Sequence, residues 1–135
     1  MSLRILKIGT HRPHAISQRQ AAKVAQAISW EGGELARRLP ALYRKTQIKE
    51  RGSVLLTMKD RPDLLSDFFT PARGAEDAGP TTGERVDRFA QNAGNLALSA
   101  SRKALEGAQV QLSEITHVVT VSCTGFMAPG FDVAL

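Results

Sequence analysis

The feature that most constrains the fold is a long helical pattern that leads into a short β-branched run. Between residues 84 and 106, apolar side chains recur at spacings of three and four, as on one face of an amphipathic helix. Many of them are Ala, which permits close approach of another backbone. After a polar link, residues 115–121 are strongly β-branched and predict a buried strand. A helix that feeds a buried strand indicates an α/β fold.

The N-terminal part contains weaker signals. Residues 3–8 partly alternate in polarity, which predicts a short strand. Ser17 and Gln20 have the spacing of a capping box and predict a helix that continues to about Ser29. The segments around these elements are expected to be a loop at 11–16, a polar connection at 45–51 and an extended stretch at 52–57.

A second, basic helix is expected from Glu34 through Tyr43, kinked or ended around Pro40. Pro62 suits a first helical position, so a short helix is predicted over residues 63–69.

The length, 135 residues, fits one domain, and we expect residues 1–135 to form one. Residues 70–83 include three Gly and two Pro and predict a surface loop within that domain. Thr81 and Glu84 form a second capping-box pattern that starts the long helix, and Gly107 is expected to stop it.

The single cysteine excludes a disulfide framework and a Cys-rich zinc module, and no metal site is expected. Arg4 and Lys7 interrupt the apolar residues at the N-terminus, so no signal-peptide core is present there. No apolar stretch has the length of a membrane helix. These observations predict a soluble cytoplasmic protein with no membrane partner.

The positive charge is concentrated in the first half of the chain. Residues 1–61 hold 13 basic against 4 acidic residues, a net charge of +9, whereas residues 62–135 hold 5 basic against 9 acidic, a net charge of −4. Aromatic residues make up only 5%, which argues against a stacking surface for nucleic acid, and no nucleic-acid motif is present. The basic cluster fits either a solvated helix face or an anion site, and comprises Arg37, Arg38, Arg44, Lys45, Lys49 and Arg51.

Cys123 follows the predicted strand 115–121 and is a candidate nucleophile, although an unpaired cysteine is often simply buried. His117 shares its strand parity but lies about 20 Å away along an extended chain, beyond hydrogen-bond reach. His11 and His14 fall in a loop of unknown position. No catalytic dyad is therefore predicted.

Pro129 is expected to open a helix with Asp132 in its first turn. That helix would have no C-cap before Leu135, so we interpret the chain as a fragment.

Several ordered motifs carry a resemblance to a known family. Residues 115–132, ITHVVTVSCTGFMAPGFD, resemble the strand, turn and helix start of the type III polyketide synthases, the chalcone and stilbene synthase family. Ile8-Gly9-Thr10 with Pro13 resembles the family's opening motif, and residues 42–51 resemble its basic helix and K-[ST]-x-I-x-x-R segment. The match spans essentially the whole chain.

The resemblance implies a thiolase-like fold of which this chain is an incomplete first half, with a mixed sheet and a long Ala-rich buried helix. It implies a homodimeric acyltransferase that condenses an acyl-CoA starter with malonyl-CoA, with no permanently bound cofactor. The family's catalytic residues are Cys, His and Asn. Cys123 does not match that cysteine, which is expected beyond Leu135, so the chain alone is expected to be inactive.

Matched residue by residue, Cys123 and Thr124 are expected to line the starter-unit pocket, and Ala128 to occupy the position that crosses the dimer interface. Arg38 and Lys45 match positions that contact the CoA phosphates. A third such position is Ala41, a departure for which the neighbouring Arg37 or Arg44 would substitute.

Two alternatives remain open. One is a stand-alone, non-catalytic truncated paralogue that binds acyl-CoA or a full-length synthase. The other is a fragment of another thiolase-fold enzyme, such as a ketoacyl-carrier-protein synthase III or a hydroxymethylglutaryl-CoA synthase.

Overall fold

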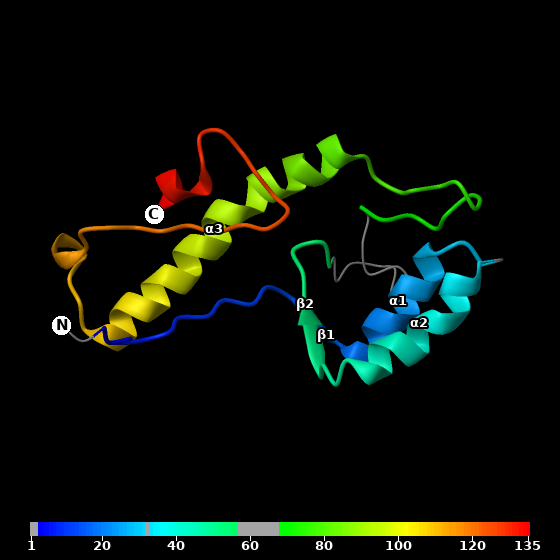
Figure 1. The fold of residues 1–135 in the computed structure, drawn as a ribbon, viewed down its shortest axis with the longest axis horizontal. Coiled ribbons are helices and arrows are strands. Elements are labelled where there is room, and N and C mark those ends of the chain that lie inside the picture. The colour runs from blue at the N-terminus through cyan, green and yellow to red at the C-terminus, as the bar shows by residue number, and fades with distance from the viewer. Residues whose placement is uncertain (1–2, 32, 57–67) are drawn as a thin grey trace. The chain divides into compact units, whose positions relative to one another are not determined.

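The structure is a computed structural model that describes residues 3–31, 33–56 and 68–135 (Figure 1). The chain divides into two compact units, Arg12–Thr81 and Met1–His11 with Thr82–Leu135. The helix predicted over residues 63–69 lies largely outside the described residues. The described residues of the two units hold three α-helices and a two-stranded sheet, so the coarse α/β class is confirmed.

In the residues that the structure describes, the unit Arg12–Thr81 contains two helices and a small sheet. Strand β1 (Ala15–Ser17) pairs antiparallel with β2 (Glu50–Gly52), with Ile16 opposite Arg51. Both strands fall on segments expected to be a loop and a polar connection. A strand of three residues is too short to give a periodic sequence signal. This sheet forms because two segments that are distant in the sequence pair with each other.

Helix α1 (Gln18–Ile28) begins as the capping box predicted. The backbone N–H of Gln20 donates to Ser17 Oγ at 3.2 Å, and the backbone N–H of Ser17 donates to Gln20 Oε1 at 3.0 Å. These bonds satisfy donors that a helix start leaves unpaired. The prediction of this helix is therefore confirmed.

Helix α2 (Glu34–Lys45) contains Pro40 and continues past it, as one of the two expected outcomes. It packs against α1 in the antiparallel sense, since Gln18 bonds to Tyr43 while Gln26 bonds to Ala36. The small core of this unit consists of Ile16, Gln18, Ala21, Ala22 and Ala36.

The stretch from Thr70 to Thr81 has neither helix nor strand. Its backbone is tied to α1 by the Ala72 N–H, which donates to the Ile28 carbonyl at 3.1 Å. Within it, Asp77 accepts hydrogen bonds from the backbone N–H groups of Arg73 and Gly79. Gly79 has a φ of +69°, a conformation that favours glycine.

The other unit is organised around α3 (Thr82–Ala108), which includes the whole predicted helix. The extended N-terminal segment runs beside it (Figure 1). A Cβ on Gly9 would overlap the Ala100 carbonyl and the Ala104 backbone nitrogen, so the two backbones touch there. Gly107 lies inside α3 against the Lys7 side chain, and the left-handed residue that follows the helix is Gln109, with φ 56°. The prediction that Gly107 stops this helix is therefore wrong.

Three expectations are not met in the structure, two of them in this unit and one in the sheet of the other unit. The segments 3–8 and 115–121 are not strands, and Val118, Val119 and Val121 are 57%, 86% and 84% exposed. No side chain of α3 is buried, although most of its apolar positions are half-buried. The sheet among the described residues is antiparallel, not mixed. Strands form only where other strands complete their hydrogen bonds, and no described segment does so beside residues 115–121.

Two short 3₁₀ helices complete the unit, η1 (Leu112–Glu114) and η2 (Phe131–Ala134). Helix η2 starts two residues after Pro129, with Asp132 in its first turn as expected. It packs on α3, where the Phe89 and Phe131 rings meet edge to face at 6.0 Å. Among the helices that the structure describes, none is both long and apolar enough to cross a membrane.

Candidate functional site

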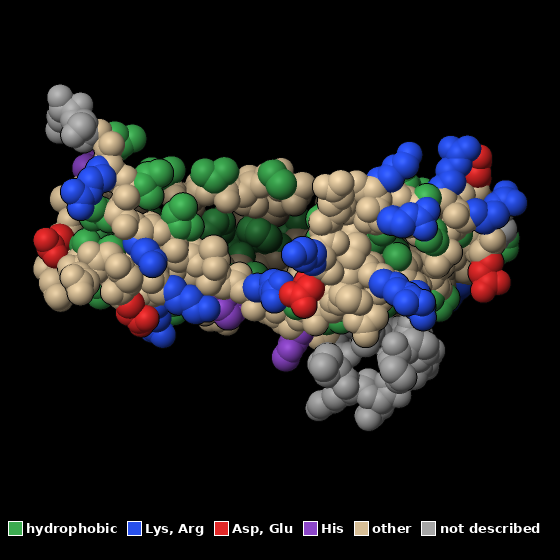
Figure 2. All heavy atoms as spheres, turned by 90° about the horizontal axis from the view of Figure 1, so that it is seen from below, with side chains coloured by type: hydrophobic (Ala, Val, Ile, Leu, Met, Phe, Trp, Pro, Cys, Tyr) green, Lys and Arg blue, Asp and Glu red, His purple; other side chains and the backbone are tan. Residues whose placement is uncertain are grey.

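On the face shown in Figure 2, Lys and Arg side chains gather over the unit that holds α1 and α2. Helix α2 directs Ala36 into the core against α1, which leaves its other faces in solvent. Glu34 lies in its first turn, and Arg44 and Lys45 in its last turn, as the helix dipole prefers. The basic residues at the C-terminal end of α2 therefore interact favourably with the helix dipole.

The two predicted CoA contacts lie on one exposed face of α2. Arg38 and Lys45 are seven residues apart, which is two helical turns, or about 10 Å along the axis. Arg38 forms an exposed ion pair with Glu34, whose side chain is 67% exposed. Lys45 makes no ion pair or side-chain hydrogen bond with the described part of the chain. Both cations are accessible to an anion in solvent.

The other cluster residues separate into different roles. Arg51 donates from Nε to Gln18 Oε1 at 2.8 Å, and its guanidinium lies 5.0 Å from the centre of the Tyr43 ring. It therefore holds β2 against the two helices. Arg37 and Arg44 are exposed on α2, on either side of the half-buried Ala41.

Sequence reasoning missed Gln18 as a structural centre. Its Nε2 donates to the Tyr43 carbonyl at 2.8 Å and to Thr46 Oγ1 at 2.7 Å, while its Oε1 accepts from Arg51. The residue is buried, with 9% of its surface exposed. No local pattern indicates this, because all its side-chain partners are distant in sequence.

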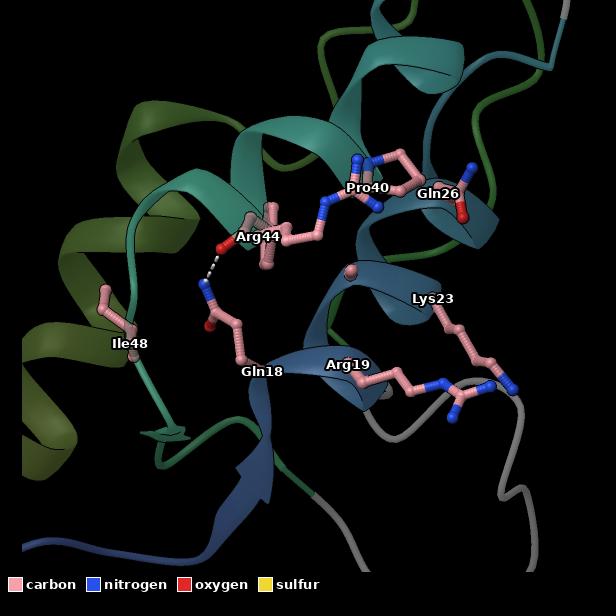
Figure 3. A pocket seen from close by; sticks show the side chains of 9 residues that line it. Gln18, Arg19, Lys23, Gln26, Pro40, Arg44 and Ile48 are labelled. Atoms are coloured by element: carbon pink, nitrogen blue, oxygen red, sulfur yellow. Dashed lines mark hydrogen bonds between the residues drawn. The ribbon is translucent and has the colours of Figure 1, made fainter.

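A groove of about 540 Å³ lies between α1 and α2 (Figure 3). Its lining includes Arg44 from the predicted cluster, together with Arg19 and Lys23, which sequence reasoning did not select. Those two residues are one turn apart on α1, a spacing that could have identified them once Arg44 was placed opposite. Arg38 and Lys45 do not line the groove.

The predicted pocket residues lie in the other unit, on the chain that follows residues 115–121. Cys123, Thr124 and Ala128 are all exposed. The Cys123 thiol lies 3.9 Å from Thr124 Oγ1, and the turn is closed by the Gly125 N–H, which donates to Ser122 Oγ at 3.2 Å. None of the three predicted residues lines the cavity of about 340 Å³ between α3 and η2.

Nothing in the described residues activates Cys123 for catalysis. The ring of His117 bonds to Thr116 Oγ1 at 2.9 Å, and no hydrogen bond joins a described histidine to the thiol. Within the same described ranges, no group of three or more His, Cys, Asp or Glu residues is placed to hold a metal ion.

Comparison with known proteins gives relatives over nearly the whole chain. The chain is 32% identical over 132 residues to the α-pyrone synthesis polyketide synthase-like protein Pks18 of Mycobacterium tuberculosis, and equally to that of Mycobacterium bovis. The match covers 96% of this chain and 30% of Pks18. The chain thus spans less than a third of the length of these relatives.

Two further relatives match over shorter stretches. Polyketide synthase 37 of Dictyostelium discoideum is 42% identical over 53 residues, which are 39% of this chain and 2% of that protein. Phloroglucinol synthase of Pseudomonas fluorescens is 38% identical over 47 residues, 35% of this chain and 14% of that protein. No family model and no solved structure matches the chain.

The match to Pks18 over 96% of this chain bears out the resemblance that the sequence motifs carry. The chain is similar to the N-terminal part of a type III polyketide synthase.

Proposed function

We propose that this chain supplies the N-terminal part of a type III polyketide synthase, an acyltransferase that condenses an acyl-CoA starter with malonyl-CoA units. The observation that carries the proposal is the 32% identity to Pks18 over 96% of the chain. The thiolase-like fold belongs to the same proposal. The long helix α3 fits a helical layer of such a fold. The apolar extended segments beside it fit strands whose partners lie in other parts of the fold.

Within that enzyme, the face of α2 that carries Arg38 and Lys45 binds the CoA phosphates. Guanidinium and ammonium groups form charge-assisted hydrogen bonds with phosphate oxygens. Two cations about two turns apart can contact two phosphate groups of one CoA molecule. The Glu34 carboxylate competes with phosphate for Arg38, because it already pairs with that guanidinium.

The segment with Cys123, Thr124 and Ala128 forms part of the starter pocket, with Ala128 toward the dimer interface. Their exposure in this chain fits side chains that other parts of a larger enzyme would enclose. None of the three matches the family's catalytic cysteine. We therefore expect residues 1–135 alone to release no polyketide from acyl-CoA and malonyl-CoA, and turnover that Cys123→Ala abolishes would contradict this.

A second candidate function is a non-catalytic module that pairs with a full-length synthase. It is favoured by the exposed apolar side chains of the unit around α3, which include Leu3, Ile5, Val119 and Val121. Such a module would co-elute with the synthase in size-exclusion chromatography and would contribute no catalytic residue to it.

The CoA face is tested by calorimetric titration of the full chain with CoA. Arg38→Gln with Lys45→Gln removes two charge-assisted hydrogen bonds, so we expect CoA affinity to fall at least about tenfold. Lys49→Gln with Arg73→Gln removes the same charge elsewhere in the unit, at exposed side chains with no predicted CoA contact, and serves as the matched control. Equal losses of CoA affinity in the two double variants would contradict a specific CoA face, because general electrostatic attraction would then explain the binding.

Glu34→Gln gives a gain-of-affinity test of the same face. It frees Arg38 from its ion pair at little cost in stability, because exposed pairs contribute about 0–1 kcal/mol. We expect tighter CoA binding by this variant. Weaker binding would contradict a phosphate contact at Arg38.

A further inference from the structure

The groove between α1 and α2 has the dimensions of a small-molecule site. Its volume of about 540 Å³ falls within the range of about 300–1,000 Å³ that is usual for ligand pockets. The two helices run antiparallel, so the groove follows both of them. It is lined from Gln18 and Ile48 at one end to Gln26 at the other.

The charged groups of this groove all have one sign. Arg19 and Lys23 come from α1 and Arg44 from α2, and no acidic residue lines the groove. None of these three cations makes an ion pair or side-chain hydrogen bond with the described residues. In Figure 3 the Arg44 side chain extends toward Pro40, whereas the Arg19 and Lys23 side chains extend from α1 in a direction of their own. An anion in the groove would therefore meet donors from both helices.

The remaining lining is largely apolar. It consists of Ala22, Pro40, Tyr43 and Ile48, with the amides of Gln18 and Gln26. Both amides already donate to the protein: Gln18 Nε2 to Tyr43 and Thr46, and Gln26 Nε2 to the Ala36 carbonyl at 3.1 Å. A ligand in the groove would therefore contact mainly apolar side chains and the three unpaired cations.

We propose that this groove binds a small anionic amphiphile, a molecule with a carboxylate or phosphate head and a short apolar body. The cations take the head, and Pro40, Tyr43 and Ile48 take the body. Arg38 and Lys45, the two residues of the CoA face, do not line this groove, although Arg44, one of the two substitutes expected for Ala41, does. The inference therefore goes beyond the proposed function and does not rest on it.

Three probes separate the parts of this ligand: decanoate has the charge and the chain, acetate the charge alone, and decan-1-ol the chain alone. Titrated into the full chain at low salt, decanoate is expected to bind at least about tenfold more tightly than either of the others. Acetate binding as tightly as decanoate would overturn the proposal, because the apolar lining would then contribute nothing. Decan-1-ol binding as tightly would overturn it as well, because the cations would then contribute nothing.

Substitutions locate the site. Lys23→Gln with Arg44→Gln is expected to weaken decanoate binding about tenfold or more, whereas Arg37→Gln with Lys49→Gln, with the same net charge, leaves it nearly unchanged. All four side chains are exposed, and unchanged circular dichroism and melting temperature verify the fold. Equal weakening by both pairs would contradict a site in the groove.

The CoA-face variant distinguishes this inference from the proposed function. Arg38→Gln with Lys45→Gln is expected to weaken CoA binding and to leave decanoate binding intact. Loss of decanoate affinity in that variant would overturn a separate groove site. CoA affinity that persists in it would overturn only the CoA face.

Discussion

Gln18 connects α1, the C-terminal end of α2 and β2 within the unit Arg12–Thr81. Its amide joins α1 to the carbonyl of Tyr43, to Thr46 and to Arg51 on β2. Loss of the amide would remove three hydrogen bonds made by a buried side chain, although Thr46 Oγ1 would still donate to the Tyr43 carbonyl at 2.8 Å.

Gln18→Met keeps the length of the side chain and removes its hydrogen bonds. We expect the free energy of unfolding to fall by about 1–3 kcal/mol, measured by urea denaturation. Gln91→Ala, an exposed position on α3, is the control and should change it by no more than about 0.5 kcal/mol. An equally small effect at Gln18 would mean that water replaces its partners.

Asp77 makes the loop before α3 sensitive to acid. The pKa of its carboxyl lies below the ordinary value of 3.8, because the backbone N–H groups of Arg73 and Gly79 donate to the carboxylate at 3.0 and 2.9 Å. A depressed pKa in the folded state stabilises the fold above the unfolded value, and that contribution is lost as the pH falls through the folded pKa.

We therefore expect the amide-proton shifts of Arg73 and Gly79 in NMR to stay constant at neutral pH and to move only below about pH 4. Asp77→Asn should abolish this titration. Amide shifts in the variant that titrate like those of the parent chain would show that another group is responsible.

At the scale of elements, the packing of the N-terminal segment on α3 depends on Gly9. A Cβ at this position would collide with backbone atoms of Ala100 and Ala104, which cannot move aside as a flexible side chain can. The close approach exists because α3 is rich in Ala where the segment crosses it.

Gly9→Ala is expected to destabilise the unit around α3 by about 1–3 kcal/mol, measured as faster hydrogen exchange of the α3 amides. Gly74→Ala is the control, since nothing lies within 4 Å of a Cβ there. Unchanged exchange in the Gly9 variant would contradict the backbone contact.

The elements that sequence could predict are those whose cause is local. The capping box at Ser17 and the apolar periodicity of α3 depend on residues one or two turns apart, and both helices formed as expected. The β-branched run at 115–121 has the composition of a strand but lacks a described partner, so it stays extended and exposed. Strand propensity describes how well a residue fits a sheet. Whether the sheet forms depends on the neighbouring segments that can pair with the strand.

The same distinction applies to the candidate sites. Arg38 and Lys45 share a face because both lie on one helix, which the sequence spacing already implies. The groove cations Arg19, Lys23 and Arg44 come together only when α1 packs on α2. No spacing within either helix predicts that pairing.

At the scale of the whole molecule, the exposed apolar side chains and the short match to Pks18 agree. The chain spans 30% of that relative, and the unit around α3 exposes large apolar side chains such as Leu3, Val119 and Phe126. Apolar segments of this kind are normally covered in a folded protein. Both observations support the proposal that this chain acts together with the remaining parts of a synthase.

The most direct measurement replaces the N-terminal 30% of Mycobacterium tuberculosis Pks18 with this chain and assays α-pyrone formation. The account predicts that the chimera forms α-pyrone, and that Arg38→Gln with Lys45→Gln lowers its rate about tenfold at low CoA-thioester concentration. A chimera with the circular dichroism and elution volume of Pks18 that forms no α-pyrone would contradict it.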